Sequence, residues 1–171
     1  MVSSIVTHVI GTAALMVVLA MVISFTSSTT SYVIYNNERR VLVSIAESIA
    51  LQLKYAINSR SDTNVTLDYP LWVVGQQPYM ILVGSGLALK NKYDFLWSQN
   101  LSSDAIYVIV VSIDYRVYGC KIVCNQSFSN YFIVVEDDPA QFSSTRLVQL
   151  RQRVIGDTII LEFVVIGDKT P

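Results

Sequence analysis

Few residues of the kinds that perform chemistry occur in this sequence, and their spacing favours no catalytic site. His8 is the only histidine, and nucleophilic triads of the Ser-His-Asp or Cys-His type need a histidine beside the nucleophile. The sequence contains no phosphate-binding loop, dinucleotide fingerprint, His-Glu-x-x-His motif or EF-hand loop. We therefore predict that the protein is not an enzyme and binds no cofactor.

The two cysteines, Cys120 and Cys124, lie four positions apart. In a straight strand their Cα atoms would be about 13 Å apart, whereas a disulfide requires Cα atoms within about 7 Å. A disulfide between them therefore requires a tight loop at residues 121–123. The alternatives are two buried free thiols or a metal site, although zinc would lack histidine partners because His8 lies in an apolar segment.

A run of acidic residues, Glu136-Asp137-Asp138, precedes Pro139. Carboxylate oxygens are ligands of the type that calcium prefers. Such a run is more often a solvated turn, so we assign no metal site.

Asn-x-Ser/Thr sequons point to an extracellular domain, because this tripeptide is the acceptor for N-glycosylation. Three of them occur, all in the C-terminal part of the chain, and their asparagines are Asn64, Asn100 and Asn125. We treat these as candidate glycosylation sites.

The distribution of charge along the chain is uneven and separates an uncharged N-terminal segment from the rest. Only 15% of the 171 residues are charged and 52% are hydrophobic, and no charged residue occurs before Glu38. The net charge of −1 gives no reason to expect a nucleic-acid partner. The length allows one ordinary domain with an appendage.

The segment from Ile5 to Phe25 is long enough, at about 1.5 Å per residue, to form a helical rod of roughly 30 Å, the thickness of a bilayer core. Its apolar residues fall on every side, so it requires an apolar surround, which lipid or a bundle of identical helices provides. The alternative is a buried core helix of a soluble protein. A cleaved secretory signal is disfavoured because no basic region precedes the apolar run. The predicted core of the bundle or membrane segment is Ile5, Val9, Leu15, Val18, Leu19 and Val22.

The predicted helix continues to about Ile57 but becomes amphipathic. It passes through Ser24–Ser31, in which every residue except Phe25 carries a hydroxyl. Such side chains bond carbonyls one turn back and bend or loosen helices, although a solvated exit from a membrane explains them equally well. Beyond this segment an apolar residue recurs every four positions, which predicts a face that docks on a sheet. The docking residues are Val41, Ile45, Ile49, Leu53 and Ile57.

The rest of the chain has the period and composition of β-strands. We predict strands over 64–69, 71–74, 79–83, 106–113, 116–123, 131–135, 146–155 and 158–166, with a terminal hairpin turn at Gly156-Asp157. The nearly continuous apolar run 106–113 predicts a central strand covered on both faces, by the amphipathic helix and by a second sheet or neighbouring subunits. The predicted fold is α+β: a long helix (1–57) packed on an antiparallel, sandwich-like β-domain (58–171).

This layout, an uncharged apolar helix with an amphipathic continuation and a C-terminal β-domain, resembles the archaeal type IV pilin-like proteins. The resemblance implies a precursor cleaved by a prepilin-type peptidase, and assembly by pilus machinery into a filament of identical subunits. It also implies helices bundled at the axis and β-domains outside, often glycosylated. The chain departs from the bacterial pattern, which has a glutamate near the start of the mature helix, since no acid precedes Glu38. Stator-type accessory subunits of the archaellum share the same outline.

The basic residues give an opposing indication of orientation. Arg39 and Arg40 follow the apolar rod and nothing basic precedes it, so the positive-inside rule places the β-domain in the cytoplasm. We expect that a basic leader removed before Met1 sets the orientation instead.

The expected function is therefore a structural subunit of a surface filament used for adhesion, inserted in the membrane before assembly. The alternatives are a membrane-anchored accessory or stator subunit and a bitopic extracytoplasmic binding protein.

Overall fold

The computed structural model describes residues 2–73, 77–126 and 131–169, and of residues 2–5 and 7 it describes the backbone alone. The chain divides into two compact units, Met1–Asn37 and Glu38–Pro171. This boundary falls at the first charged residue, and it assigns the second half of the long helix to the unit that contains the sheets. The sequence-based boundary at 57/58 followed the change from helix to strand instead.

Helix α1 runs from Val2 to Ser59 and is followed by Arg60, which has a φ of 50°. The segment contains no proline and only one glycine, Gly11, so nothing in the helix interior interrupts the backbone hydrogen bonds. The predicted end at Ile57 is therefore correct to within one turn.

The second unit contains two four-stranded sheets. Sheet A has the order β1 (Thr63–Thr66), β7 (Arg146–Ile155), β8 (Thr158–Asp168) and β5 (Phe132–Val135). Sheet B has the order β4 (Tyr118–Asn125), β3 (Ala105–Ser112), β2 (Tyr79–Ser85) and β6 (Ala140–Ser143). All described pairs are antiparallel except β5 with β8, which are parallel. The α+β class and the antiparallel-rich, two-sheet domain predicted from the sequence are confirmed.

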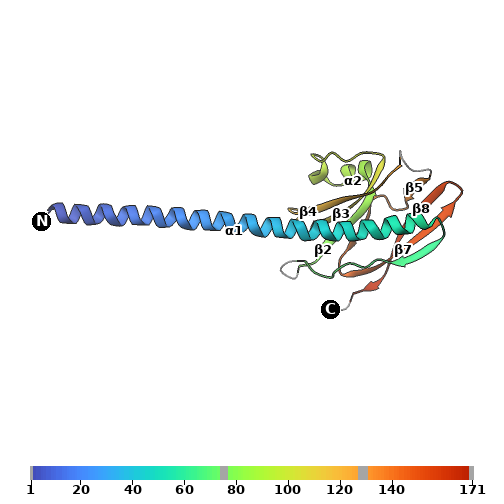
Figure 1. The fold of residues 1–171 in the computed structure, drawn as a ribbon, viewed down its shortest axis with the longest axis horizontal. Coiled ribbons are helices and arrows are strands. Elements are labelled where there is room, and N and C mark those ends of the chain that lie inside the picture. The colour runs from blue at the N-terminus through green and yellow to red at the C-terminus, as the bar shows by residue number, and fades with distance from the viewer. Residues whose placement is uncertain (1, 74–76, 127–130, 170–171) are drawn as a thin grey trace. The chain divides into compact units, whose positions relative to one another are not determined.

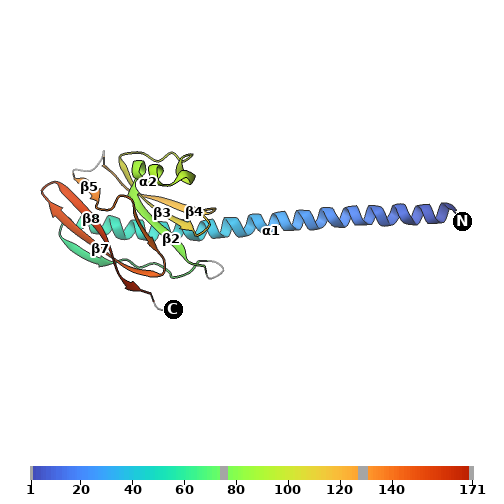
Figure 2. The same ribbon diagram turned by 180° about the vertical axis from the view of Figure 1, so that it is seen from behind.

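Two apolar clusters hold this unit together, one on each face of sheet B. The larger cluster joins the buried face of α1 to both sheets, and includes Leu42, Ile49, Val108 and Leu161. The smaller cluster lies on the other face, beneath helix α2 (Gly86–Lys92) and the short 3-10 helix η1 (Asp94–Leu96). Figures 1 and 2 show α2 on the side of sheet B away from β7 and β8.

Strand β3 is buried along its whole length, as the apolar run 106–113 predicts. The amphipathic part of α1 covers one face, as expected, and sheet A contributes to the same cluster. The second cover was predicted wrongly. It is the segment containing α2 and η1, not a second sheet or a neighbouring subunit. Helix α2 has only seven residues, too few for its periodicity to be recognised in the sequence.

Two further predictions concern short strands and turns. Residues 71–73 form no strand, and the rest of that prediction, Val74, lies outside the described residues. The terminal hairpin is confirmed: Ile155 pairs with Thr158 and Gly156 has a φ of 60°, a conformation that glycine adopts at little cost.

Helix α1 approaches sheet B most closely at Gly119 of β4. A Cβ atom at this position would overlap the backbone of Leu42 and Val43. The missing side chain therefore lets the helix backbone lie directly on the strand, and this is a position where glycine is required for packing.

Candidate functional site: the apolar segment of α1

The apolar side chains of the first unit are exposed on all sides of α1. Among the predicted core residues, Val9, Leu15, Val18, Leu19 and Val22 are each more than half exposed. The side chain of the sixth, Ile5, lies outside the described residues. An exposed apolar surface of this kind is typical of segments that lie in lipid or against another protein.

Three threonine hydroxyls in this segment form hydrogen bonds with the helix itself. Thr12 Oγ1 donates to the His8 carbonyl at 2.6 Å, Thr26 Oγ1 to the Val22 carbonyl at 2.8 Å, and Thr29 Oγ1 to the Phe25 carbonyl at 2.9 Å. The helix continues without a break through Ser24–Ser31. Because these hydroxyls already have acceptors, an apolar environment would leave none of them without a partner.

The described part of the chain contains one helix long and apolar enough to cross a membrane, and it is α1. By length and composition the helix is compatible with a membrane anchor. The chain therefore has a candidate membrane-spanning segment near its N-terminus.

The amphipathic half of α1 is fixed to the sheets by the predicted docking face. Ile45, Ile49, Leu53 and Ile57 are buried, and Val41 is half-buried against the same cluster. Polar contacts at the margin add to this packing, and they come from residues that the apolar periodicity did not indicate. The Gln52 side chain donates to the Asp68 carbonyl at 2.7 Å and accepts from the Asp68 N–H at 2.9 Å.

A second polar contact pairs Glu47 of α1 with Lys121 of β4, with 3.0 Å between Oε1 and Nζ. Like the amide pair at Gln52, this contact lies at the exposed margin of the docking face and adds to the packing of its buried residues. The β-domain is therefore held on the helix by its own residues.

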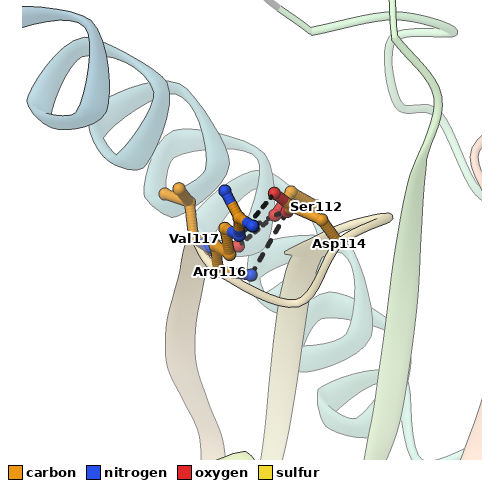
Figure 3. Close-up of polar contacts among 4 residues, drawn as sticks. All are labelled: Ser112, Asp114, Arg116 and Val117. Carbon is orange, nitrogen blue, oxygen red and sulfur yellow. Dashed lines mark hydrogen bonds and ion pairs between the residues drawn. The ribbon is translucent and has the colours of Figure 1, made fainter. Parts of the chain in front are cut away.

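The β3–β4 turn is an ordered polar structure (Figure 3). Ser112 Oγ donates to the Asp114 carboxylate at 2.6 Å and accepts from the Val117 N–H at 3.1 Å, while the Arg116 N–H donates to Asp114 at 3.2 Å. These hydrogen bonds, first among them that of Ser112, lower the pKa of Asp114. Burial and the nearby charge of Asp114 raise the pKa of Glu38 at the start of this unit. The turn is therefore coupled electrostatically to the part of α1 that begins at Glu38.

The two cysteines are free thiols on opposite faces of sheet B. Cys120 pairs with Ile109 and packs on the smaller cluster, whereas Cys124 pairs with Ile106 and packs on the larger one. A β-bulge at Ile106/Tyr107 produces this reversal, because an extra residue in a strand changes the face of every residue beyond it. Burial raises the pKa of each thiol to about 11. The sequence left open a disulfide, two free thiols or a metal site, and the structure contains two free thiols.

The three sequons differ in exposure. Asn64 on β1 and Asn100 after η1 are exposed, whereas Asn125 at the end of β4 is half-buried. The sequon of Asn125 also ends at Ser127, which lies outside the described residues. Nothing in the structure tests their glycosylation, which stays a prediction.

Asp138 of the acidic run forms hydrogen bonds with Ser85 at the end of β2. Asp138 accepts from the Ser85 N–H at 2.9 Å and from the Ser85 hydroxyl at 2.6 Å. Over the described ranges no group of three or more His, Cys, Asp or Glu residues is arranged to hold a metal ion. Asp138 therefore has a structural role at the crossing between the two sheets.

Comparisons of the chain with protein-family models, with curated proteins and with solved structures gave no match. Any function must therefore be argued from the residues and geometry above.

Proposed function

We propose that this protein is a structural subunit of an extracellular filament, in which the apolar segments of many copies form a central bundle and the β-domains lie outside. Its role is attachment of the cell to surfaces. The observation that supports this most directly is the length of the uncharged, exposed part of α1.

This uncharged part is longer than a membrane anchor needs. Residues 2–37 of α1 contain no charged side chain, and at about 1.5 Å per residue they span roughly 54 Å. The hydrocarbon core of a bilayer is about 30 Å thick, and about 20 residues cross it. Even a helix tilted by about 40°, the upper end of the usual range, would span roughly 41 Å. A bundle of identical helices has no such limit of thickness.

The excess length is apolar again. Beyond the hydroxyl-rich segment, Val33 and Ile34 are 49% and 55% exposed, and Tyr32 is 69% exposed. In a single anchor these side chains would lie at or beyond the headgroups. In a bundle the neighbouring helices would cover them, which favours the filament over the anchor.

Assembly from the membrane is energetically reasonable. A helix that leaves lipid for a bundle of like helices exchanges one apolar surround for another, so the hydrophobic effect opposes the transfer little and close packing decides the outcome. The hydrogen-bonded threonines are compatible with lipid and with a helix bundle, because their hydroxyls leave no hydrogen-bonding group unsatisfied.

The experiment is electron microscopy of material sheared from the cell surface, combined with mass spectrometry of the purified filaments. We expect filaments in which this chain is the major component. A deletion strain complemented with the wild-type gene is the control. Filaments that lack this chain, or a chain found only in membrane fractions, would leave the accessory or anchor role instead.

A further inference from the structure

Strand β8 has an open edge over its second half. Strand β5 pairs with residues 158–161 of β8 only, and the last bond on that side is from the Glu136 N–H to the Leu161 carbonyl at 3.0 Å. Since N–H and C=O groups along a strand point alternately to its two edges, those of Phe163 and Val165 point to the same side as those of Leu161.

The register with β7 agrees with this direction. Val165 pairs with Val148, whose carbonyl accepts from the Leu67 N–H at 2.9 Å on the far side of β7. The groups of Val148 therefore point away from β8, and those of Val165 point away from β7. Within the described part of the chain, no hydrogen bond satisfies the N–H or C=O of Phe163 or Val165.

The edge is open because the chain leaves sheet A at Glu136 and crosses to sheet B. The crossing is fixed by Asp138, which accepts two hydrogen bonds from Ser85. It is also packed tightly against Gly84, where a Cβ atom would overlap Asp138 and Pro139. The residues after β5 are thereby held away from β8, and no other described strand of the chain takes their place.

A groove of about 350 Å³ lies along this edge. Phe142 of β6 and Phe163 of β8 both line it, and their rings stack on each other with centroids 5.8 Å apart. Val165 and Ala140 add apolar walls, and Lys92 and Asp137 are exposed at its margin. Neither charge forms an ion pair with a described residue.

We infer that this groove binds an extended peptide segment of another protein, which adds a strand to sheet A beside residues 163–165. Unpaired main-chain groups next to an apolar pocket are the two requirements of this mode of recognition: the main chain provides affinity and the pocket selects a side chain. The segment places one apolar side chain in the pocket, an acidic residue toward Lys92 and a basic residue toward Asp137.

A second copy of this chain is a poor source for the segment. Its described strands are already paired in sheets, and α1 is helical throughout its described length. Residues 67–73 lie outside the strands, but Leu67, Tyr69 and Val73 in this segment are buried, and the Leu67 N–H donates to the Val148 carbonyl of β7. From the described residues we therefore assign the segment to a different protein, and the inference does not depend on the filament.

The test is binding of two fluorescent heptapeptides to the full-length protein in detergent micelles, measured by anisotropy with empty micelles as the blank. One peptide is acetyl-Thr-Glu-Thr-Leu-Thr-Lys-Thr-amide, and the other has the reversed sequence, because the added strand has two possible directions. Glu, Leu and Lys alternate with Thr, so all three face the groove when the peptide is extended. We expect saturable binding of one peptide and weaker binding of the other.

Val165→Pro removes one N–H from the open edge and leaves the bonds to β7 intact. It should weaken binding about tenfold, as expected for the loss of one main-chain hydrogen bond, while Val165→Thr, which keeps the N–H, should bind within about twofold of wild type. If Val165→Pro does not fold by circular dichroism, the double variant Lys92→Gln/Asp137→Asn takes its place, with the same expected loss.

Absence of binding by both peptides at about 1 mM would overturn the inference. So would equal binding by wild type and the folded variant used, either Val165→Pro or the double variant.

Discussion

Individual residues of the β-domain carry specific consequences for stability, and Gly119 is the clearest because α1 lies directly on it. Gly119→Ala should destabilise the protein by about 1–3 kcal/mol, since the new methyl group would overlap the helix backbone and force the helix to shift. Urea unfolding of the full-length protein in micelles measures the change. Gly167→Ala is the matched control in β8, where a Cβ would meet no atom within 4 Å. Equal stability of the two variants would contradict the close approach.

The Glu38–Asp114 pair predicts a pH dependence of stability. Burial and the charge of Asp114 raise the pKa of Glu38 in the folded protein, so the ionised side chain costs stability above that pKa and costs none once it is protonated. Glu38→Gln should therefore raise the melting temperature at pH 7 and leave it unchanged near pH 3.

The ionised Asp114 side chain stabilises the folded protein, whereas the ionised Glu38 side chain destabilises it, so Asp114 provides the control. Hydrogen bonds lower its pKa in the folded protein, so its contribution is present above the unfolded pKa and is lost as pH falls. Asp114→Asn should therefore lower the melting temperature at pH 7 and have no effect well below the folded pKa. A gain from Asp114→Asn, or a loss from Glu38→Gln at pH 7, would refute the assigned environments.

At the scale of elements, the packing of α1 against the two sheets holds the second unit together. Ile49 is fully buried on the docking face, whereas Leu51, two residues later, is 60% exposed. Ile49→Lys should destabilise the β-domain by about 3–5 kcal/mol because a charge would be buried without a partner, and Leu51→Lys should stay within about 0.5 kcal/mol of wild type. Thermal unfolding monitored by tryptophan fluorescence compares them. Similar melting temperatures for the two lysine variants would exclude the docking face.

Elements with a sustained period were predictable from the sequence, and those defined by tertiary contacts were not. Helix α1 and the β7–β8 hairpin follow directly from apolar spacing and from Gly156. Helix α2 and strand β6 are too short to show a period, and residues 71–73 have strand-like composition but no strand partner.

Some features of the candidate site could likewise be predicted from the sequence, and others depend on tertiary contacts. The exposed apolar residues of α1 could be listed from composition alone. The opposite faces of Cys120 and Cys124 depend on a bulge that is defined only by pairing with β3. The end of β5 at Val135 agrees with the strand predicted over 131–135. The open edge of β8 depends instead on the register in which β5 pairs with β8, which is defined by the tertiary structure.

At the scale of the whole molecule, the proposed filament requires a dry environment around the apolar segment. Val18→Asp places a carboxylate in that segment without a partner, so it should abolish filaments while leaving the fold of the β-domain intact. Val18→Leu, which keeps an apolar side chain, is the control and should assemble. Counting filaments per cell by negative-stain microscopy gives the result. Normal filaments from Val18→Asp would show that this position is not enclosed.

The most direct measurement of the central claim is hydroxyl-radical footprinting of native surface material, with the chain unfolded in guanidinium chloride without detergent as the reference. Met16, Met21 and Tyr32 are 70%, 67% and 69% exposed in the single chain, so they report on what covers it. A filament protects all three, and a single membrane anchor protects the methionines but leaves Tyr32 reactive. We predict strong protection of all three residues. Oxidation of Met16 and Met21 at the rates of the denatured chain would show that water reaches the segment, and would contradict both the filament and the anchor.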